Sequence, residues 1–231
     1  MFHAMSRGRV KLERISSDMP RPAVTTVILA GGLGTRIGGE KGLKLLHGRP
    51  LIGWVLDSVS HQSEEILINA NGELDPYSCF GYSIIADQIP DWPGPLAGLQ
   101  VALRCARHDW VVSVPCDTPF LPDNLISGLF EAVRQSGMKE ASVVLVAGRR
   151  QPTIALYHKS VLWKLDNYLA SGGRKVNGWL ETLQLGEAQF DNEMAFKNIN
   201  TPDDLVFAKA ISEQEVAREF SDSLMCNREA K

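Results

Sequence analysis

A glycine-rich segment after the first apolar run of the chain has the residue types needed to hold a phosphate group. Residues 29–43, LAGGLGTRIGGEKGL, combine closely spaced glycines with Arg36 and Lys41. Glycine lets backbone N–H groups approach phosphate oxygens, and the two cations offset the negative charge. The alternative is a strained turn with solvated charges, which is the better interpretation of an arbitrary glycine-rich loop.

The segment differs from two well-known phosphate loops. The form G-x-x-x-x-G-K-[ST] fails because Lys41 is preceded by Glu40 and followed by Gly42. The dinucleotide form G-x-G-x-x-G fails because the frame that begins at Gly32 ends on Ile37. The pattern therefore indicates a different loop.

Polar side chains stand at the ends of three other apolar runs. Asp117 follows WVVSVPC, Asp87 ends YSIIAD, and Asn69 lies near the end of EILINA. Ligands of open parallel sheets collect at the carboxyl ends of the strands. A carboxylate there, opposite a basic loop, is well placed to hold a Mg²⁺ ion that bridges triphosphate oxygens. For Asp117 the alternative is a cap of the following turn.

A further loop, DWPGPLAGLQ at residues 91–100, leads into a helix. Prolines stiffen it, and Gly98 is expected in the first helical turn. A helix start presents free N–H groups that suit an anion or the polar edge of a base. A rigid connection is the alternative.

Apolar periodicity predicts an alternation of strands and helices. Strands are expected at 24–30, 65–70, 82–86, 110–114 and 141–147, and helices at 50–62, 96–107 and 124–135. Such alternation favours an α/β fold with a mostly parallel sheet and helices on both faces. After Gly148 we expect an antiparallel addition with edge strands, consisting of a strand at 153–158, helices near 161–170 and 176–183, and short strands around Ala188 and Phe196.

Length and composition suit one enzyme-sized domain. The 231 residues are expected to divide into a flexible N-terminal extension at 1–22, a single domain at 23–210, and a C-terminal helix and tail at 211–231. The formal charge of -3 gives no bulk attraction to nucleic acid or to an anionic membrane. No C-x-x-C pair occurs, and no apolar run reaches the ~18 residues of a membrane span. A reducing cytoplasm fits these features.

Four motifs resemble one enzyme family, the molybdenum cofactor guanylyltransferases, or MobA-type nucleotidyltransferases. LAGGLGTRIGGEKGL, PGPLAG, CDTPFLP and FKNINTPDDL look like its signatures, in order and at similar spacing. The likeness extends from about Thr25 to Leu205. It implies a Rossmann-like three-layer α/β/α nucleotidyltransferase fold of the GT-A-like kind. One departure is Gly39-Glu40-Lys41, which is one residue shorter than the family pattern and carries glutamate in place of aspartate.

The resemblance implies that the chain transfers GMP from GTP to the terminal phosphate of molybdenum-molybdopterin, giving molybdopterin guanine dinucleotide and pyrophosphate. Mg²⁺ would be bound by Asp117, and catalysis would depend on Arg36, Lys41 and Asp117. The residues implied to contact GTP are Leu29, Ala30, Gly31, Gly32, Lys41, Asn69, Asp87 and Asp117. Those implied to face the pterin are Arg174, Asn198 and Asn200.

Other functions remain open from the sequence. The nearest alternatives are a CTP-using molybdopterin cytidylyltransferase and a sugar-phosphate nucleotidyltransferase. A nucleotide-binding regulator is an alternative of another class, but a pure binder needs no carboxylate ready for Mg²⁺ beside Lys41. Contacts with molybdopterin-handling proteins, apo-molybdoenzymes or their chaperones would coexist with catalysis.

Overall fold

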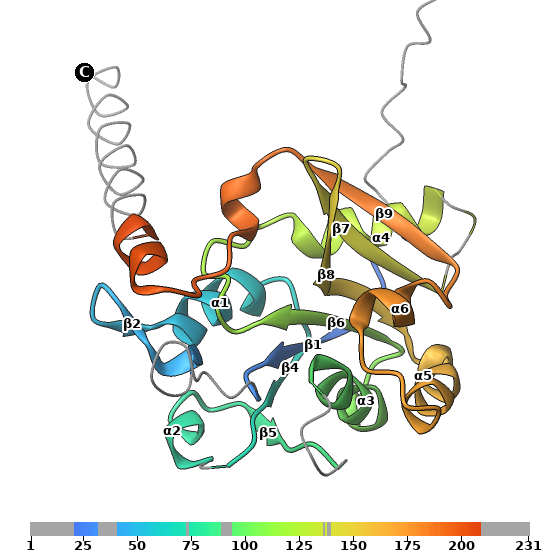
Figure 1. Ribbon diagram of the computed structural model, residues 1–231, viewed down its shortest axis with the longest axis horizontal. Coiled ribbons are helices and arrows are strands. Elements are labelled where there is room, and N and C mark those ends of the chain that lie inside the picture. The colour runs from blue at the N-terminus through green and yellow to red at the C-terminus, as the bar shows by residue number, and fades with distance from the viewer. Residues whose placement is uncertain are drawn as a thin grey trace, which may run out of the picture.

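One central sheet organises the fold (Figure 1). The computed structural model describes residues 21–31, 41–72, 74–88, 94–135, 137 and 140–208. Within them, seven strands pair in the order β5-β4-β1-β6-β8-β7-β9. Their bounds are β1 Val24–Leu29, β4 Glu65–Asn69, β5 Ser83–Ile85, β6 Trp110–Pro115, β7 Ala141–Val146, β8 Arg149–His158 and β9 Leu185–Phe190. Strand β8 alone among these runs antiparallel to its neighbours, β6 and β7.

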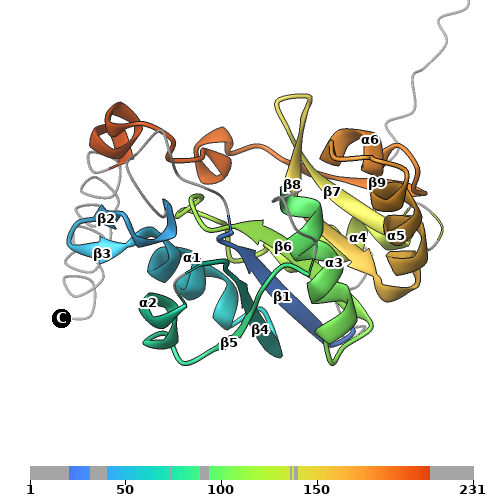
Figure 2. The same ribbon diagram turned by 60° about the horizontal axis from the view of Figure 1, so that its bottom comes forward.

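Helices cover both faces of this sheet (Figures 1 and 2). Helices α1 (Leu51–Ser60) and α4 (Leu125–Gln135) supply apolar side chains to one core cluster, and α3 (Pro95–Cys105), α5 (Leu162–Ala170) and α6 (Val176–Leu180) to a second. Both clusters include strand residues. The α/β expectation with helices on both faces is therefore confirmed.

Short elements complete the described part of the chain. A small hairpin of β2 (Leu45–Leu46) and β3 (Arg49–Pro50) follows the 3-10 turn η1 (Lys41–Leu43). The other short pieces are α2 (Asp75–Ser78), η2 (Lys159–Val161), η3 (Glu193–Phe196) and a helical stretch at 202–208. None of the helices in the described ranges combines the length and apolar character that crossing a membrane requires.

The segment after β7 agrees with the expected antiparallel addition and differs from it in one element. The expected strand at 153–158 is part of β8, which pairs antiparallel with β6 and β7; a tight turn at Ala147 and Gly148, both with positive φ, folds the chain back along β7. The expected strand around Phe196 is wrong. Those residues form η3, where Asn192 Oδ1 accepts a bond from Met194 N and the Phe196 ring packs 5.1 Å from Phe190.

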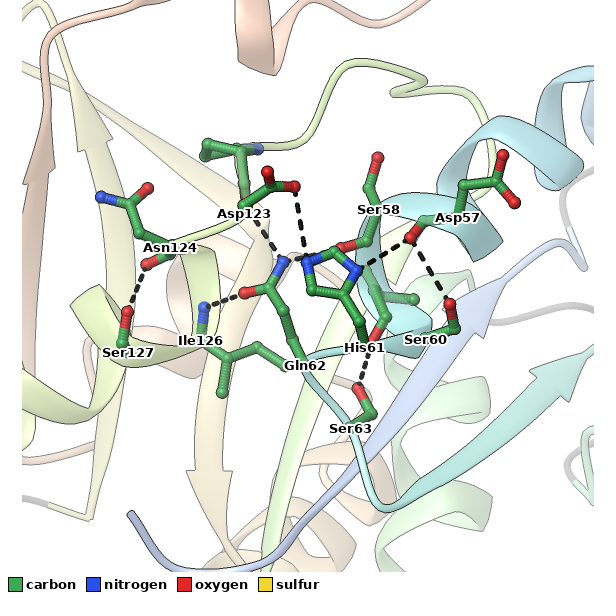
Figure 3. Close-up of polar contacts among 12 residues, drawn as sticks. Asp57, Ser58, Ser60, His61, Gln62, Ser63, Asp123, Asn124, Ile126 and Ser127 are labelled. Carbon is green, nitrogen blue, oxygen red and sulfur yellow. Dashed lines mark hydrogen bonds and ion pairs between the residues drawn. The ribbon is translucent and has the colours of Figure 1, made fainter. Parts of the chain in front are cut away.

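Gln62 joins the end of α1 to the start of α4 (Figure 3). Its side-chain nitrogen donates to Ser58 O at 2.6 Å and Pro122 O at 3.1 Å, and its oxygen accepts from Ile126 N at 3.1 Å. The last bond satisfies one of the N–H groups that a helix start leaves without an intrahelical partner. Because Asp117 lies on the segment that runs from β6 to α4, Gln62 anchors the far end of that segment.

The expected N-terminal extension and C-terminal tail lie largely outside the described residues. Most of the proposed extension at 1–22 and all of the proposed tail at 211–231 fall beyond the described residues. The single domain at 23–210 stays a prediction.

Candidate active site

The carboxyl ends of three parallel strands meet at one edge of the sheet. Leu29 of β1 is in register with Asn69 of β4 on one side and Pro115 of β6 on the other. Beyond the strands, Ala30 N donates to Asn69 O at 2.8 Å, and Cys116 N donates to Leu29 O at 3.2 Å. The chain order reverses at β1, since β4 and β5 extend the sheet in one direction and β6 in the other. Such a reversal is where open α/β sheets bind ligands.

Lys41 and Asp117 lie together at this edge. Lys41 Nζ is 3.3 Å from Asp117 Oδ2 and donates to Asn200 Oδ1 at 2.5 Å. Asn198 Nδ2 donates to Asp117 Oδ1 at 3.2 Å. Four of the residues predicted from the sequence therefore form one hydrogen-bonded cluster, although the positions 41 and 200 are far apart in the chain.

Asp117 is an enclosed carboxylate. Its side chain is 6% exposed. Burial raises the pKa of Asp117 above its ordinary value, while the charge and hydrogen bond of Lys41 and the amide of Asn198 act in the opposite direction. Because burial disfavours the charged form of the carboxylate, an added cation would stabilise that form. Asp117 is therefore suited to a divalent metal brought in with a nucleotide.

A glycine allows Lys41 to reach this position. Gly42 is buried, and a Cβ built on it would lie 3.3 Å from Cys116 Cβ and Sγ and 3.4 Å from Tyr77 Oη. Contacts that close leave little room for a side chain, so the turn η1 packs directly against the segment that follows β6. Lys41 therefore lies beside Asp117, although the residues just before it, which lie outside the described ranges, are one fewer than in the family pattern.

A second polar cluster surrounds Asp87. Asn69 Nδ2 donates to Asp87 Oδ1 at 2.8 Å. Asn71 Nδ2 donates to Asp87 Oδ2 at 2.8 Å, and Asp87 N donates to Asn71 Oδ1 at 2.8 Å. Asn71 was not among the residues predicted from the sequence. A second amide two residues after Asn69 is its sequence signal, which alone does not distinguish Asn71 from a polar loop residue.

Two glycines let the backbone approach these amides. A Cβ at Gly98 of α3 would lie 2.1 Å from Asn69 Oδ1, and one at Gly31 would lie 2.6 Å from Asn71 Nδ2. Neither site accepts a larger residue without a shift. Gly31 and Gly98 therefore pack directly against the two amides that bond to Asp87.

The remaining predicted residues have different outcomes. Gly32 and Arg36 lie outside the described residues. Leu29 and Ala30 contribute their backbone at the sheet edge. Arg174 follows α5, where its Nη1 donates to Leu169 O at 2.9 Å and Gly173 O at 2.7 Å. Those bonds tie the guanidinium to its own turn, and the pterin role of Arg174 stays a prediction.

Metal ligands are sparse in the described ranges. They contain no group of three or more histidine, cysteine, aspartate or glutamate side chains placed to hold a metal ion. Mg²⁺ needs no such group, since it keeps several waters and uses one or two carboxylates with substrate phosphates. The single enclosed carboxylate of Asp117 fits that mode of binding.

Comparison with known proteins identifies the family. Residues 26–186 match the model of the MobA-like NTP transferase domain. A protein named molybdenum cofactor guanylyltransferase from Cupriavidus taiwanensis is 42% identical over 190 residues, which cover 80% of this chain and 96% of that protein. One of the same name from Vibrio atlanticus is 42% identical over 184 residues, covering 78% and 92%.

A solved structure agrees with these relatives. The crystal structure of molybdopterin-guanine dinucleotide biosynthesis protein A from Archaeoglobus fulgidus superposes with a TM-score of 0.68 at 28% identity, covering 82% of this chain and 99% of that one. The sheet order, the strand-edge clusters and the relatives agree. The chain belongs to the MobA-like NTP transferase family, alongside the molybdenum cofactor guanylyltransferases.

Proposed function

We propose that this protein is a molybdenum cofactor guanylyltransferase. It transfers GMP from GTP to the terminal phosphate of molybdenum-molybdopterin, which yields molybdopterin guanine dinucleotide and pyrophosphate. Relatives of that name that are 42% identical over most of the chain support the activity. The observation that carries the mechanism is the cluster of Lys41, Asp117, Asn198 and Asn200 at the strand edge.

Each of the two polar clusters contacts a different part of the nucleotide. The nucleoside lies against the backbone of Leu29 to Gly31, with Asn69 and Asp87 at its polar edge. The triphosphate lies towards Lys41, and the resemblance to the family adds Gly32 and Arg36, which lie outside the described residues, to the residues proposed to contact it. Asp117 would hold Mg²⁺, which would supply neutralisation of the phosphate charge and of the charge on departing pyrophosphate.

The chain's residues act by positioning and charge rather than by proton transfer. An oxygen of the terminal pterin phosphate forms a bond to the α-phosphorus of GTP, and the bond from that phosphorus to the bridging oxygen of pyrophosphate breaks. The attacking oxygen is already anionic, so no general base is needed. The Lys41 ammonium offsets negative charge where the two anions meet. A local cation is needed there because the net charge of the chain is -3.

Asn198 and Asn200 border the acceptor side. Both belong to the segment that returns to the strand edge, where Ile199 N donates to Asp117 O at 2.8 Å. Their amides suit the hydrogen-bonding groups of a pterin, and Arg174 provides a further cation for its phosphate. The proposed substrates are GTP and molybdenum-molybdopterin. The proposed protein partners are molybdopterin-handling proteins and apo-molybdoenzymes or their chaperones. The proposed location is the cytoplasm.

A nucleotide and acceptor panel tests this function. Pyrophosphate release is measured with GTP or CTP, combined with molybdenum-molybdopterin or a hexose phosphate, in the presence of Mg²⁺. We expect release with GTP and the pterin only. Turnover with CTP would favour the cytidylyltransferase alternative, and turnover with a hexose phosphate would favour a sugar-phosphate nucleotidyltransferase.

A further inference from the structure

We propose that Asn71 is a positioning residue for base recognition: it orients the Asp87 carboxylate towards a base edge with two adjacent N–H donors. The inference rests on the proposed function, and it adds a residue that the sequence analysis did not assign. It starts from the hydrogen bonds around Asp87, which hold that side chain from both sides.

Both oxygens of the Asp87 carboxylate already accept one amide N–H. Asn69 donates to Oδ1 and Asn71 donates to Oδ2, each at 2.8 Å. The backbone of Asp87 is held too, because its N–H donates to Asn71 Oδ1 at 2.8 Å. Asn71 therefore makes two bonds to one residue, one that fixes the chain and one that fixes the carboxylate plane.

The remaining acceptor sites define what this carboxylate recognises. An ionised carboxylate only accepts hydrogen bonds, and each oxygen has about two lone-pair sites. Among the contacts of the described residues, one site on each oxygen is filled by an amide, so one acceptor on each oxygen is left there. The Watson–Crick edge of guanine offers two neighbouring donors, N1–H and the N2 amino group. Cytosine and adenine place a ring nitrogen acceptor on that edge, which a carboxylate repels.

The Asn71 amide has little freedom to choose another position. A Cβ at Gly31 would lie 2.6 Å from Asn71 Nδ2, so the amide packs against the backbone that follows β1. Asn69 is held comparably, since it is 3% exposed and its oxygen lies against Gly98. The acceptor pair of Asp87 is thus set before the nucleotide arrives, which lowers the cost of ordering it on binding.

The test compares GTP with ITP, whose base lacks the N2 amino group. Steady-state kinetics of the full chain are measured for wild type, Asn71→Ala, Asn71→Asp and Asp87→Ala with molybdenum-molybdopterin and Mg²⁺. In Asn71→Asp the acceptor for Asp87 N is retained, but the donor to the Asp87 carboxylate is lost. The exposed Asn167 of α5 provides the control, Asn167→Ala, and thermal unfolding checks that every variant is folded.

We expect Asn71→Ala to raise KM for GTP about tenfold and to reduce the preference for GTP over ITP about tenfold, with a smaller effect on kcat. Asn71→Asp is expected to lose the same preference although the bond to Asp87 N persists. Asn167→Ala should match wild type. A purely structural role for Asn71 would lower stability without changing the ratio between the two nucleotides.

Two results would overturn the inference, and they differ from a failure of the proposed function. If both Asn71 variants are folded and keep the wild-type ratio of GTP to ITP while Asp87→Ala loses it, Asp87 is oriented without Asn71. If Asp87→Ala also keeps that ratio, the carboxylate does not contact the base. If instead wild type releases pyrophosphate from CTP and not from GTP, the proposed function itself is wrong.

Discussion

Asp117→Asn separates the proposed catalytic role of Asp117 from its structural role. The substitution keeps the size of the side chain and removes its charge. In the structure the carboxylate is 6% exposed, accepts one bond from Lys41 and accepts another from Asn198. The variant therefore loses an ion pair but also loses the cost of burying a charge, which is the largest influence on the pKa of Asp117.

These opposing effects give different magnitudes for stability and for turnover. Lys41 loses its counter-ion, but its side chain is 28% exposed and its ammonium keeps the bond to Asn200, so we expect the free energy of unfolding to change by about 1 kcal/mol or less. Turnover has no such compensation, because the substitution removes the carboxylate proposed to hold Mg²⁺. We expect kcat to fall by roughly 10²–10³, equivalent to about 2.7–4 kcal/mol of transition-state stabilisation.

The assay is pyrophosphate release at saturating GTP and molybdenum-molybdopterin over a range of Mg²⁺ concentrations, with urea unfolding in parallel. Asp123→Asn is a matched control, since Asp123 lies on the same connecting segment but its side chain is 88% exposed. An exposed pair such as that of Asp123 with His61 contributes little. Turnover of Asp117→Asn within about threefold of wild type at saturating Mg²⁺ would show that the Asp117 carboxylate does not hold the metal.

Three further predictions follow from the same structure. Gln62→Ala removes three hydrogen bonds and leaves the buried Ile126 N without its acceptor, so urea unfolding should show a loss of about 2–3 kcal/mol. Burial alone raises the pKa of Glu65, but bonds from Arg107 N and the Thr25 hydroxyl together with the Arg107 guanidinium lower it below the ordinary 4.5. The stabilisation by Glu65 is therefore complete above that value and is lost as pH falls through the lower folded-state pKa, and unfolding measured between about pH 5 and pH 3 should depend less on pH in Glu65→Gln than in wild type. Chelation of Mg²⁺ should abolish turnover reversibly and leave the melting temperature nearly unchanged, because the described residues hold no cluster of metal ligands; a large drop in melting temperature would contradict this.

The sheet edge was predictable because parallel strands end at a common edge. The composition of runs such as β1, whose first five residues are all buried, is enough to predict a strand. Asn69, Asp87 and Asp117 each follow or end such a run, so their proximity follows from topology without knowledge of side chains. The position of β8 inside the sheet did not follow, since it depends on the turn at Ala147 and Gly148 rather than on any pattern within the strand.

Pairs of side chains were harder to predict than strand ends. Nothing in the spacing of Lys41 and Asn200 indicates that their side chains lie 2.5 Å apart, because that contact depends on how the chain returns after β9. Asn71 was missed for a related reason. An amide just beyond a strand resembles any polar loop residue until its partner is known, and its partner Asp87 lies beyond the next strand.

The return of residues 197–200 to the strand edge links the two proposed substrate sites physically. Ile199 N bonds to the backbone of Asp117, while Asn198 and Asn200 bond to Asp117 and Lys41 through their side chains. The groups proposed to face the pterin are therefore the same groups that position the residues proposed for the triphosphate and the metal. A reaction that joins two anions requires their reacting atoms to be aligned closely. Building both sites from one hydrogen-bonded cluster is a direct way to maintain that alignment.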